Sequence, residues 1–386
     1  DDQWMVFSHY TERGWTVDNL WHIFTDFYGG QYAPLAFLSY LVLYAGFGYD
    51  PFYFHMFSLL LHIGCVCLVW KLISSLLRVH GGVSEKQILY VNFITTLLFA
   101  VHPINVEAVA WISALKVLLY AFFYLLGLLC YLRYIRTSKI FYYVLTIGCF
   151  LCSFWGKEQA VTFPLALLIV DWFTNRNMKN LEVWSEKMSF LIMAFFFGII
   201  TVLSQGKGPY EMIFPLYQRL LFGCFALVEY ITKSLLPVNL NFFYPFPIVL
   251  GEEPPLHYYL YPVVLLFLMG WIIAYRNNRY LVFGVLLFLV NLLFSIHLFN
   301  MSRHAIVADR YMYLSYVGIA FLIANGIWWL RKRLSYFKAA LVFLFFYCFF
   351  LSVYTFHYTK KRENTTMVKK YTKEVLEKRL NGSNHL

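Results

Sequence analysis

The chain has 386 residues, of which 61% are hydrophobic and only 13% are charged, and its mean hydropathy is +0.61. A soluble domain of this length needs far more polar surface, so the composition excludes an ordinary globular protein and indicates an all-α polytopic membrane protein. The net charge of +11 does not indicate nucleic-acid binding, because the basic residues are dispersed among short loops and a terminal tail.

Residues 1–50 are predicted to form a first loop at the membrane surface with two interfacial helices. The stretch 17–28 is amphipathic and carries Asp18 near its start, while 32–46, after Gly29-Gly30, is more apolar but short for a span.

Apolar runs then predict about ten membrane-spanning helices in a bundle over residues 51–357. Several runs are near or below the ~20 residues that cross a bilayer, so we expect their ends to extend into the flanking polar segments. Residue 1 already lies ahead of an inward-going helix, so we expect one further span to precede this sequence and bring the total to eleven. The predicted spans are 51–78, 86–101, 115–134, 139–155, 159–173, 188–204, 256–275, 280–298, 311–330 and 337–357.

Residues 358–386 form a polar, lysine-rich tail in which 368–380 can make a short helix. The tail is shorter than one tetratricopeptide repeat of about 34 residues.

The charged residues orient the bundle. The segment 217–236 carries Arg219, Glu229 and Lys233, and we expect it to lie flat at the membrane surface, because all the basic loops then agree. Fifteen lysines and arginines then occupy one set of loops and eight the other, which makes the first set cytoplasmic. Four of the twenty acidic residues also fall on the cytoplasmic side, which leaves sixteen on the exoplasmic side. Those four are Glu85, Asp171, Glu182 and Glu186.

Polar clusters at the exoplasmic boundary are candidates for chemistry, since a bilayer protein gathers ionisable groups there when something polar binds. The adjacent carboxylates Asp1 and Asp2 can supply a base or bind a divalent cation, although a solvated loop start is an alternative. His102 and Glu107 flank a proline that breaks a span. His102 can also simply cap the preceding helix, and Lys116 can simply extend to the interface.

Two further clusters follow in the same loops. Gly156-Lys157-Glu158 is a tight connection in which the lysine either holds a phosphate or pairs locally. Arg303, His304 and Arg310 flank a short loop, and arginine's planar fork suits a phosphate, unless Arg310 pairs with neighbouring Asp309. Tyr244 lies in NFFYPFP, an aromatic segment that can line a groove or anchor at the interface.

These segments, in this order, resemble one family. The acidic doublet is followed by GQYAPLAFLSY, YAGFGYDPFYFHMFSLLLH, FAVHPINVEAVAWISALKVLLYAFFYLL, GKEQAVTFPLALLIVDW, NFFYPFP and ADRYMYLSYVGIA. The sequence is similar to bacterial relatives of the transmembrane and tetratricopeptide-repeat protein O-mannosyltransferases, which are GT-C membrane glycosyltransferases. The resemblance covers most of residues 1–357. We expect no complete tetratricopeptide repeat in residues 358–386, which departs from the family's pattern.

The resemblance implies an enzyme that moves a sugar from a polyprenyl phosphate donor to a hydroxyl of a protein or glycan by an inverting mechanism. It makes Asp1, with Asp2 beside it, the catalytic residue, and it places Arg310 at the donor phosphate. We expect Arg303 and Lys157 to contact the same phosphate. The substrate-binding candidates are His102, Glu107, Lys116, Glu158, Tyr244 and His304.

No cofactor is required by this reaction, and a divalent cation, if one takes part, would bind Asp1 and Asp2. The expected partners are the lipid-linked sugar, the acceptor and membrane lipid, and the expected location is a bacterial inner membrane with an exoplasmic active site. Two alternatives remain: a lipid or sugar transporter (a flippase), which would need ionisable groups along its spans, and a catalytically silent scaffold of the same fold.

Overall fold

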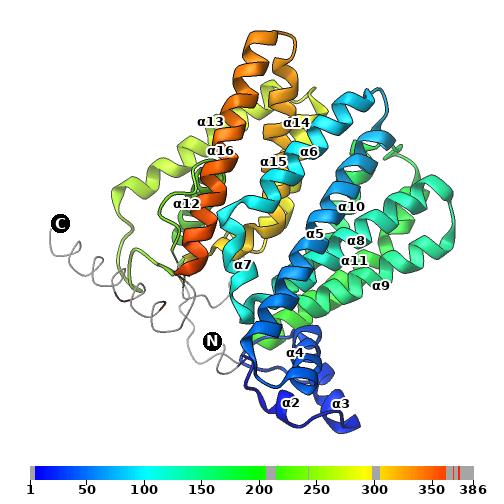
Figure 1. The fold of residues 1–386 in the computed structure, drawn as a ribbon, viewed down its shortest axis with the longest axis vertical. Coiled ribbons are helices and arrows are strands. Elements are labelled where there is room, and N and C mark those ends of the chain that lie inside the picture. The colour runs from blue at the N-terminus through cyan, green and yellow to red at the C-terminus, as the bar shows by residue number, and fades with distance from the viewer. Residues whose placement is uncertain are drawn as a thin grey trace.

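The computed structural model describes residues 5–205, 214–241, 243–297 and 305–361, together with residues 368 and 373. In this part of the chain nearly every element is a helix, so the predicted all-α class is confirmed. The long helices run as a bundle, and a group of short N-terminal helices lies at one end of it (Figure 1).

The elements alternate between long helices and short breaks. Their bounds are α2 (His9–Glu12), α3 (Val17–Thr25), α4 (Pro34–Phe47), α5 (Pro51–His80), α6 (Glu85–Val101), η1 (Pro103–Asn105), α7 (Val106–Ala110), η2 (Ile112–Ala114), α8 (Leu115–Thr137), α9 (Ile140–Gly156), η3 (Glu158–Thr162), α10 (Phe163–Phe173), α11 (Leu181–Gln205), α12 (Leu216–Leu235), β1 (Tyr244–Pro245), η4 (Leu256–Tyr259), α13 (Leu260–Ala274), α14 (Arg279–Leu292), β2 (Ala305–Val307), η5 (Asp309–Tyr311), α15 (Met312–Leu330) and α16 (Leu334–Lys360).

Each of the ten predicted spans contains a helix, and the two helices predicted in the first loop correspond to α3 and α4. Within the described ranges, six helices are long and apolar enough to cross a membrane, and α6 with the following η1 and α7, bent by 50°, would make a seventh. The helices α9 and α14 are apolar but shorter. The helices are therefore confirmed, whereas the number of ten spans stays a prediction. Apart from residues 368 and 373, the predicted helix at 368–380 lies outside the described residues.

Local chemistry sets several helix ends. The side chain of Asp50 accepts a hydrogen bond from the Phe52 N–H at the start of α5, and Ser84 does the same for the Gln87 N–H at the start of α6. These side chains satisfy backbone donors that the first helical turn leaves free. Gly81, which follows α5, has a φ of 77°, a conformation that suits glycine.

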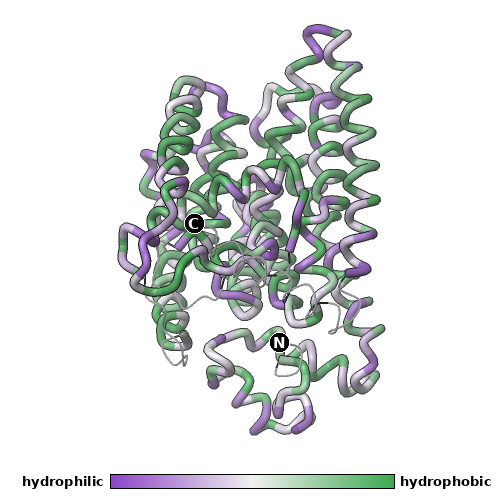
Figure 2. The backbone as a smooth tube through the Cα atoms, turned by 90° about the vertical axis from the view of Figure 1, so that its left-hand side faces the viewer, coloured by the Kyte–Doolittle hydropathy of each residue, from purple (hydrophilic) through white to green (hydrophobic). Residues whose placement is uncertain are grey.

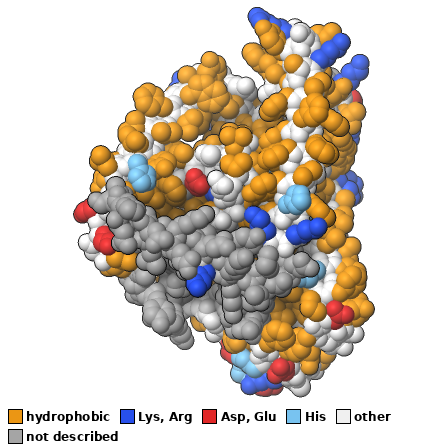
Figure 3. Space-filling view, turned by 60° about the vertical axis from the view of Figure 1, so that its left-hand side comes forward, with side chains coloured by type: hydrophobic (Ala, Val, Ile, Leu, Met, Phe, Trp, Pro, Cys, Tyr) orange, Lys and Arg blue, Asp and Glu red, His pale blue; other side chains and the backbone are white. Residues whose placement is uncertain are grey.

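Hydropathy separates the bundle from its ends. Apolar residues dominate the long helices, and polar residues gather at loops and in the N-terminal group (Figure 2). Figure 3 shows hydrophobic side chains over much of the described part of one face, with Lys and Arg at its upper tip and others lower on the same face. The loop between α15 and α16 is basic and exposed, since it carries Arg331, Lys332 and Arg333. Both views fit an integral membrane protein.

The helix α15 lies inside the bundle, where it packs against α6, α14 and α16. Its contact with α14 is close: a Cβ added to Gly318 would lie 2.5 Å from the Gly284 carbonyl oxygen and 2.7 Å from the Phe288 nitrogen. Small residues of this kind let helix backbones approach each other in membranes.

A buried ionic cluster lies at the end of α10 that is predicted to be cytoplasmic. Asp171 and Lys187, both fully buried, form an ion pair. Arg176 pairs with Asp171 at 3.1 Å and with Glu186 at 2.7 Å, and the Tyr131 hydroxyl donates to Asp171 at 2.8 Å. Two cations and two carboxylates therefore neutralise one another and join α8, α10 and α11.

We expect Gly318→Ala to destabilise the protein by about 1–3 kcal/mol, because the added methyl group meets backbone atoms that cannot turn aside. Gly326→Ala on the same helix is the matched control, since a Cβ there meets nothing within 4 Å. Thermal unfolding of both variants in the same detergent measures the difference. Equal unfolding temperatures would show that the α14–α15 contact is looser than described.

Candidate active site

The described charged residues of the candidate site lie at three interruptions of the helices. The first runs from His102 at the end of α6 through η1, α7 and η2 to the start of α8. The second is Lys157 with η3, between α9 and α10, and the third is η5, just before α15. Breaks in membrane helices expose backbone polar groups and are tolerated where protein or polar cavities surround them. The same breaks here carry the ionisable side chains.

An ion pair joins the first and third interruptions. The Arg310 Nη1 atom lies 2.6 Å from Glu107 Oε1, and the Arg310 backbone N–H donates to Glu107 Oε2 at 2.7 Å. The Glu107 side chain is 2% exposed and that of Arg310 is 24% exposed. The guanidinium also lies 5.3 Å from the ring centre of Trp111 and 5.2 Å from that of Tyr311. Glu107 therefore fixes both the backbone and the side chain of Arg310.

This geometry corrects one sequence-based alternative. Asp309 does not form the local pair with Arg310, although the two residues are neighbours. It is fully buried and accepts a hydrogen bond from the Tyr244 hydroxyl at 3.0 Å. Tyr244 reaches it because β1 pairs with β2, which places Tyr244 opposite Val307.

Every hydrogen-bonding position of the Tyr244 hydroxyl is occupied. It donates to Asp309 and accepts from Lys233 Nζ at 3.2 Å and from the Asn241 N–H at 2.7 Å. A phenol offers one donor and two acceptor positions, so a substrate hydroxyl would have to displace one of these bonds. Lys233 also pairs with Glu229 at 3.2 Å. Sequence reasoning did not assign Lys233 to the site, and only the helical spacing from Glu229 hinted at its pairing.

Lys157 is buried, with 2% of its surface exposed, and its Nζ atom makes no hydrogen bond within the described residues. The ammonium lies 4.6 Å from the centre of the Tyr311 ring, a distance typical of a cation–π contact. Burial lowers the pKa of Lys157 to about 8, against the opposing effect of nearby Glu158. Gly156 allows this placement, since a Cβ there would lie 2.8 Å from the Tyr120 nitrogen of α8.

Lys116 lies in the first turn of α8, and its Nζ donates to the Gln31 side-chain oxygen of the first loop. Sequence reasoning missed Gln31, because a single amide after two glycines carries no motif. Lys116, Lys157 and Arg310 act electrostatically on one another, and Glu158 acts on both lysines, so these residues form one cluster.

The remaining predicted residues are placed differently. His102 is buried, and its Nδ1 accepts a hydrogen bond from the Ile104 N–H at 3.2 Å. Its backbone N–H donates to the Leu98 carbonyl at the end of α6, so these contacts are structural. Its role toward a substrate stays a prediction. Asp1, Asp2, Arg303 and His304 lie outside the described residues.

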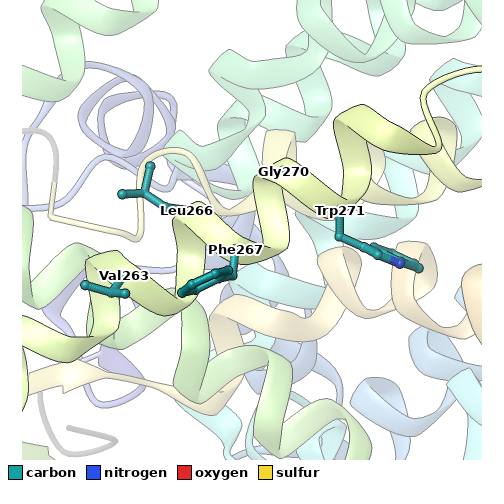
Figure 4. Close-up of a pocket in the computed structure, with 5 residues that line it drawn as sticks. All are labelled: Val263, Leu266, Phe267, Gly270 and Trp271. Carbon is teal, nitrogen blue, oxygen red and sulfur yellow. The ribbon is translucent and has the colours of Figure 1, made fainter.

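A separate apolar groove lies on α13. The cavity has a volume of about 480 Å³ and is lined by Val263, Leu266, Phe267, Gly270 and Trp271, all on one side of the helix (Figure 4). Phe267 is 77% exposed, and only 6% of the helix's apolar window is buried. The groove therefore faces lipid and is distinct from the charged cluster.

The cluster defines a cationic site at one end of a membrane helix bundle. Two of its three cations, Lys116 and Lys157, form no ion pair with a carboxylate in the described part of the chain. Lys157 is buried and Lys116 is half-buried, and cations shielded in this way without such partners are suited to an anionic ligand, above all a phosphate.

Comparison with known proteins identifies relatives of the chain. It is 32% identical over 189 residues to protein O-mannosyl-transferase TMTC2 of Mus musculus, which covers 45% of this chain and 21% of that protein. It is 30% identical over 203 residues to tmtc2 of Xenopus laevis, covering 48% and 23%, and 31% identical over 167 residues to TMTC4 of Homo sapiens, covering 38% and 22%.

The resemblance expected from the motifs is therefore confirmed, and the chain spans about a fifth of the length of these relatives. No family model and no solved structure matches the chain.

We expect Glu107→Gln to lower the free energy of unfolding by about 1.5–3 kcal/mol, because a buried hydrogen bond between charged groups is lost. Glu85→Gln is the control: Glu85 pairs with Arg78 at 3.0 Å, but both side chains are more than half exposed. Such a surface pair contributes roughly 0–1 kcal/mol. Chemical denaturation in detergent compares the two, and equal losses would remove the special role given to the Glu107–Arg310 pair.

Proposed function

We propose that this chain is the membrane part of a GT-C glycosyltransferase that moves mannose from a polyprenyl phosphate donor to a hydroxyl of a protein. The observation that carries the proposal is buried Lys157, whose ammonium forms no hydrogen bond or ion pair within the described residues and shares the Tyr311 ring with Arg310, in a chain similar to proteins named O-mannosyl-transferases. The chemistry of such a donor requires fixed positive charge at the membrane boundary.

The donor's phosphate would bind among Lys157, Lys116 and Arg310. In this reaction the bond between the anomeric carbon and the phosphate oxygen breaks, and lipid phosphate leaves with the electron pair. Preorganised cations stabilise that developing charge more effectively in a site away from bulk water. The ring of Tyr311 supports Lys157 and Arg310 together, since it lies 4.6 Å from one cation and 5.2 Å from the other.

Asp1 would act as the base. Its carboxylate takes the proton of the acceptor hydroxyl, and the oxygen attacks the anomeric carbon from the side opposite the leaving phosphate, which inverts its configuration. This assignment rests on the family resemblance, and Asp2 would position the acceptor. We place the reaction on the exoplasmic face, because the basic loops assign the other face to the cytoplasm.

A sugar-transfer assay tests this function directly. Purified protein in lipid nanodiscs is given polyprenyl phosphate mannose with labelled mannose and a mixture of secreted proteins as acceptor. We expect label in protein, and we expect Asp1→Asn to abolish it while donor binding and the unfolding temperature are kept. Activity of Asp1→Asn equal to that of the unchanged protein would remove the catalytic assignment. Transfer by neither protein, with donor binding intact, would favour the silent scaffold.

Donor binding should depend on pH through Lys157. Its pKa of about 8 means that the ammonium loses its proton as the pH rises through 8, and a neutral amine binds phosphate poorly. Affinity should therefore fall between pH 7 and pH 9, by up to about tenfold per pH unit above the pKa. Lys157→Arg keeps its charge in this range and should bind the donor with little pH dependence. Isothermal titration at several pH values measures both, and parallel slopes would exclude Lys157 from the donor site.

A further inference from the structure

A tight turn in the first loop carries Gln31. Tyr28 and Gln31 exchange two backbone hydrogen bonds of 3.1 Å, and the two residues between them, Gly29 and Gly30, have φ values of 58° and 72°. Positive φ at both central residues defines a type I′ turn, which glycine adopts without strain. The direction in which the chain leaves this turn is therefore fixed by the backbone.

The turn is anchored against the bundle. The Tyr32 hydroxyl donates to the Phe24 carbonyl at 3.0 Å, and Phe24 packs edge-on against Trp155 of α9 at 5.3 Å between ring centres. The Tyr40 hydroxyl donates to the Ile112 carbonyl at 2.9 Å, in the segment just ahead of Lys116. These contacts bring the first loop to the start of α8 and allow the Gln31 oxygen to accept a hydrogen bond from Lys116 Nζ.

The position of Lys116 needs an explanation, because a lysine at this place does not stabilise the helix. A cation in the first turn of a helix opposes the positive end of the helix dipole, which prefers anions. Lys116 nevertheless occupies the second position of α8 and lies half-buried. Glu158 and Arg310 are the charged groups that act most on it, so it belongs to the cationic cluster rather than to the lipid boundary.

The chemical identity of its partner is informative. At the other end of the bundle, buried Lys187 is held by the carboxylates of Asp171 and Glu186, which cancel its charge. Lys116 is held by a carboxamide, and Lys157 by the face of an aromatic ring. A carboxamide oxygen accepts a hydrogen bond and fixes direction but leaves the net charge of the ammonium intact.

We propose that Gln31 is a positioning residue of the transfer reaction: it orients Lys116 toward the donor's phosphate while leaving the positive charge of Lys116 available to that phosphate. The inference rests on the proposed function and extends it, because it makes the Gly29-Gly30 turn of the first loop part of the donor site.

Replacement of Gln31 by glutamate separates this role from a structural one. Gln31→Glu keeps an acceptor oxygen at the same length, so a simple tether between loop and bundle would be preserved or strengthened. It also pairs Lys116 with a carboxylate. We expect an unchanged or higher unfolding temperature together with at least a tenfold loss of affinity for polyprenyl phosphate mannose, measured by titration in nanodiscs.

Two further variants complete the test. Gln31→Ala removes the orienting bond but not the charge, so we expect near-normal donor affinity with a several-fold lower kcat. Gln87→Glu, the same chemical change at the start of α6, is the control and should leave binding and turnover unchanged. Gln31→Glu with normal donor affinity would overturn the inference.

Lysine variants distinguish that failure from failure of the proposed function. Lys116→Ala and Lys157→Ala should each weaken donor binding. If both bind the donor normally, the proposed donor site is wrong, whatever Gln31 does. If both weaken binding while Gln31→Glu does not, the donor site stands and only the role of Gln31 is refuted.

Discussion

The pair between Glu107 and Arg310 is the interaction on which the described site depends. It connects residues 203 positions apart and joins the bend after α6 to the turn before α15. Each of these breaks frees backbone groups that a bilayer cannot satisfy. A carboxylate that binds both the guanidinium and the backbone N–H of Arg310 fixes the two breaks relative to each other. The Asp309–Tyr244 bond then ties the paired strands to the same turn.

The cations at the two ends of the bundle have different kinds of partner. Arg176 and Lys187 are held by carboxylates, and their cluster is neutral and internally satisfied. Burying ions in this way requires that each has a partner, and it serves to join helices. Lys116 and Lys157 are held by uncharged groups. Within the described residues, the proposed donor site thus holds two lysines that form no ion pair with a carboxylate. This arrangement agrees better with a transferase than with a transport path lined on both sides.

The sequence was sufficient to predict the helices but not the pairs of side chains that join them. Apolar runs and capping residues such as Asp50 and Ser84 predict elements that the structure contains, because these signals are local. The clustering of Glu107, Lys157 and Arg310 was also foreseeable, since each adjoins the end of an apolar run. Their partners were not: adjacency suggested Asp309 for Arg310, whereas the fold supplies Glu107. Gln31 was not predicted as a site residue, because its contact with Lys116 depends on how the first loop packs.

Two side chains of α16 close the ends of two earlier helices. Thr355 donates to the Val101 carbonyl at the end of α6, and Tyr347 donates to the Leu235 carbonyl at the end of α12. The last carbonyls of a helix have no partner within that helix, so these two side chains satisfy groups that α6 and α12 leave free. Chains are synthesised from the N-terminus, so α6 and α12 are made before the helix that satisfies them. The end of α6, where the cationic site begins, therefore acquires this hydrogen bond only after α16 has been synthesised.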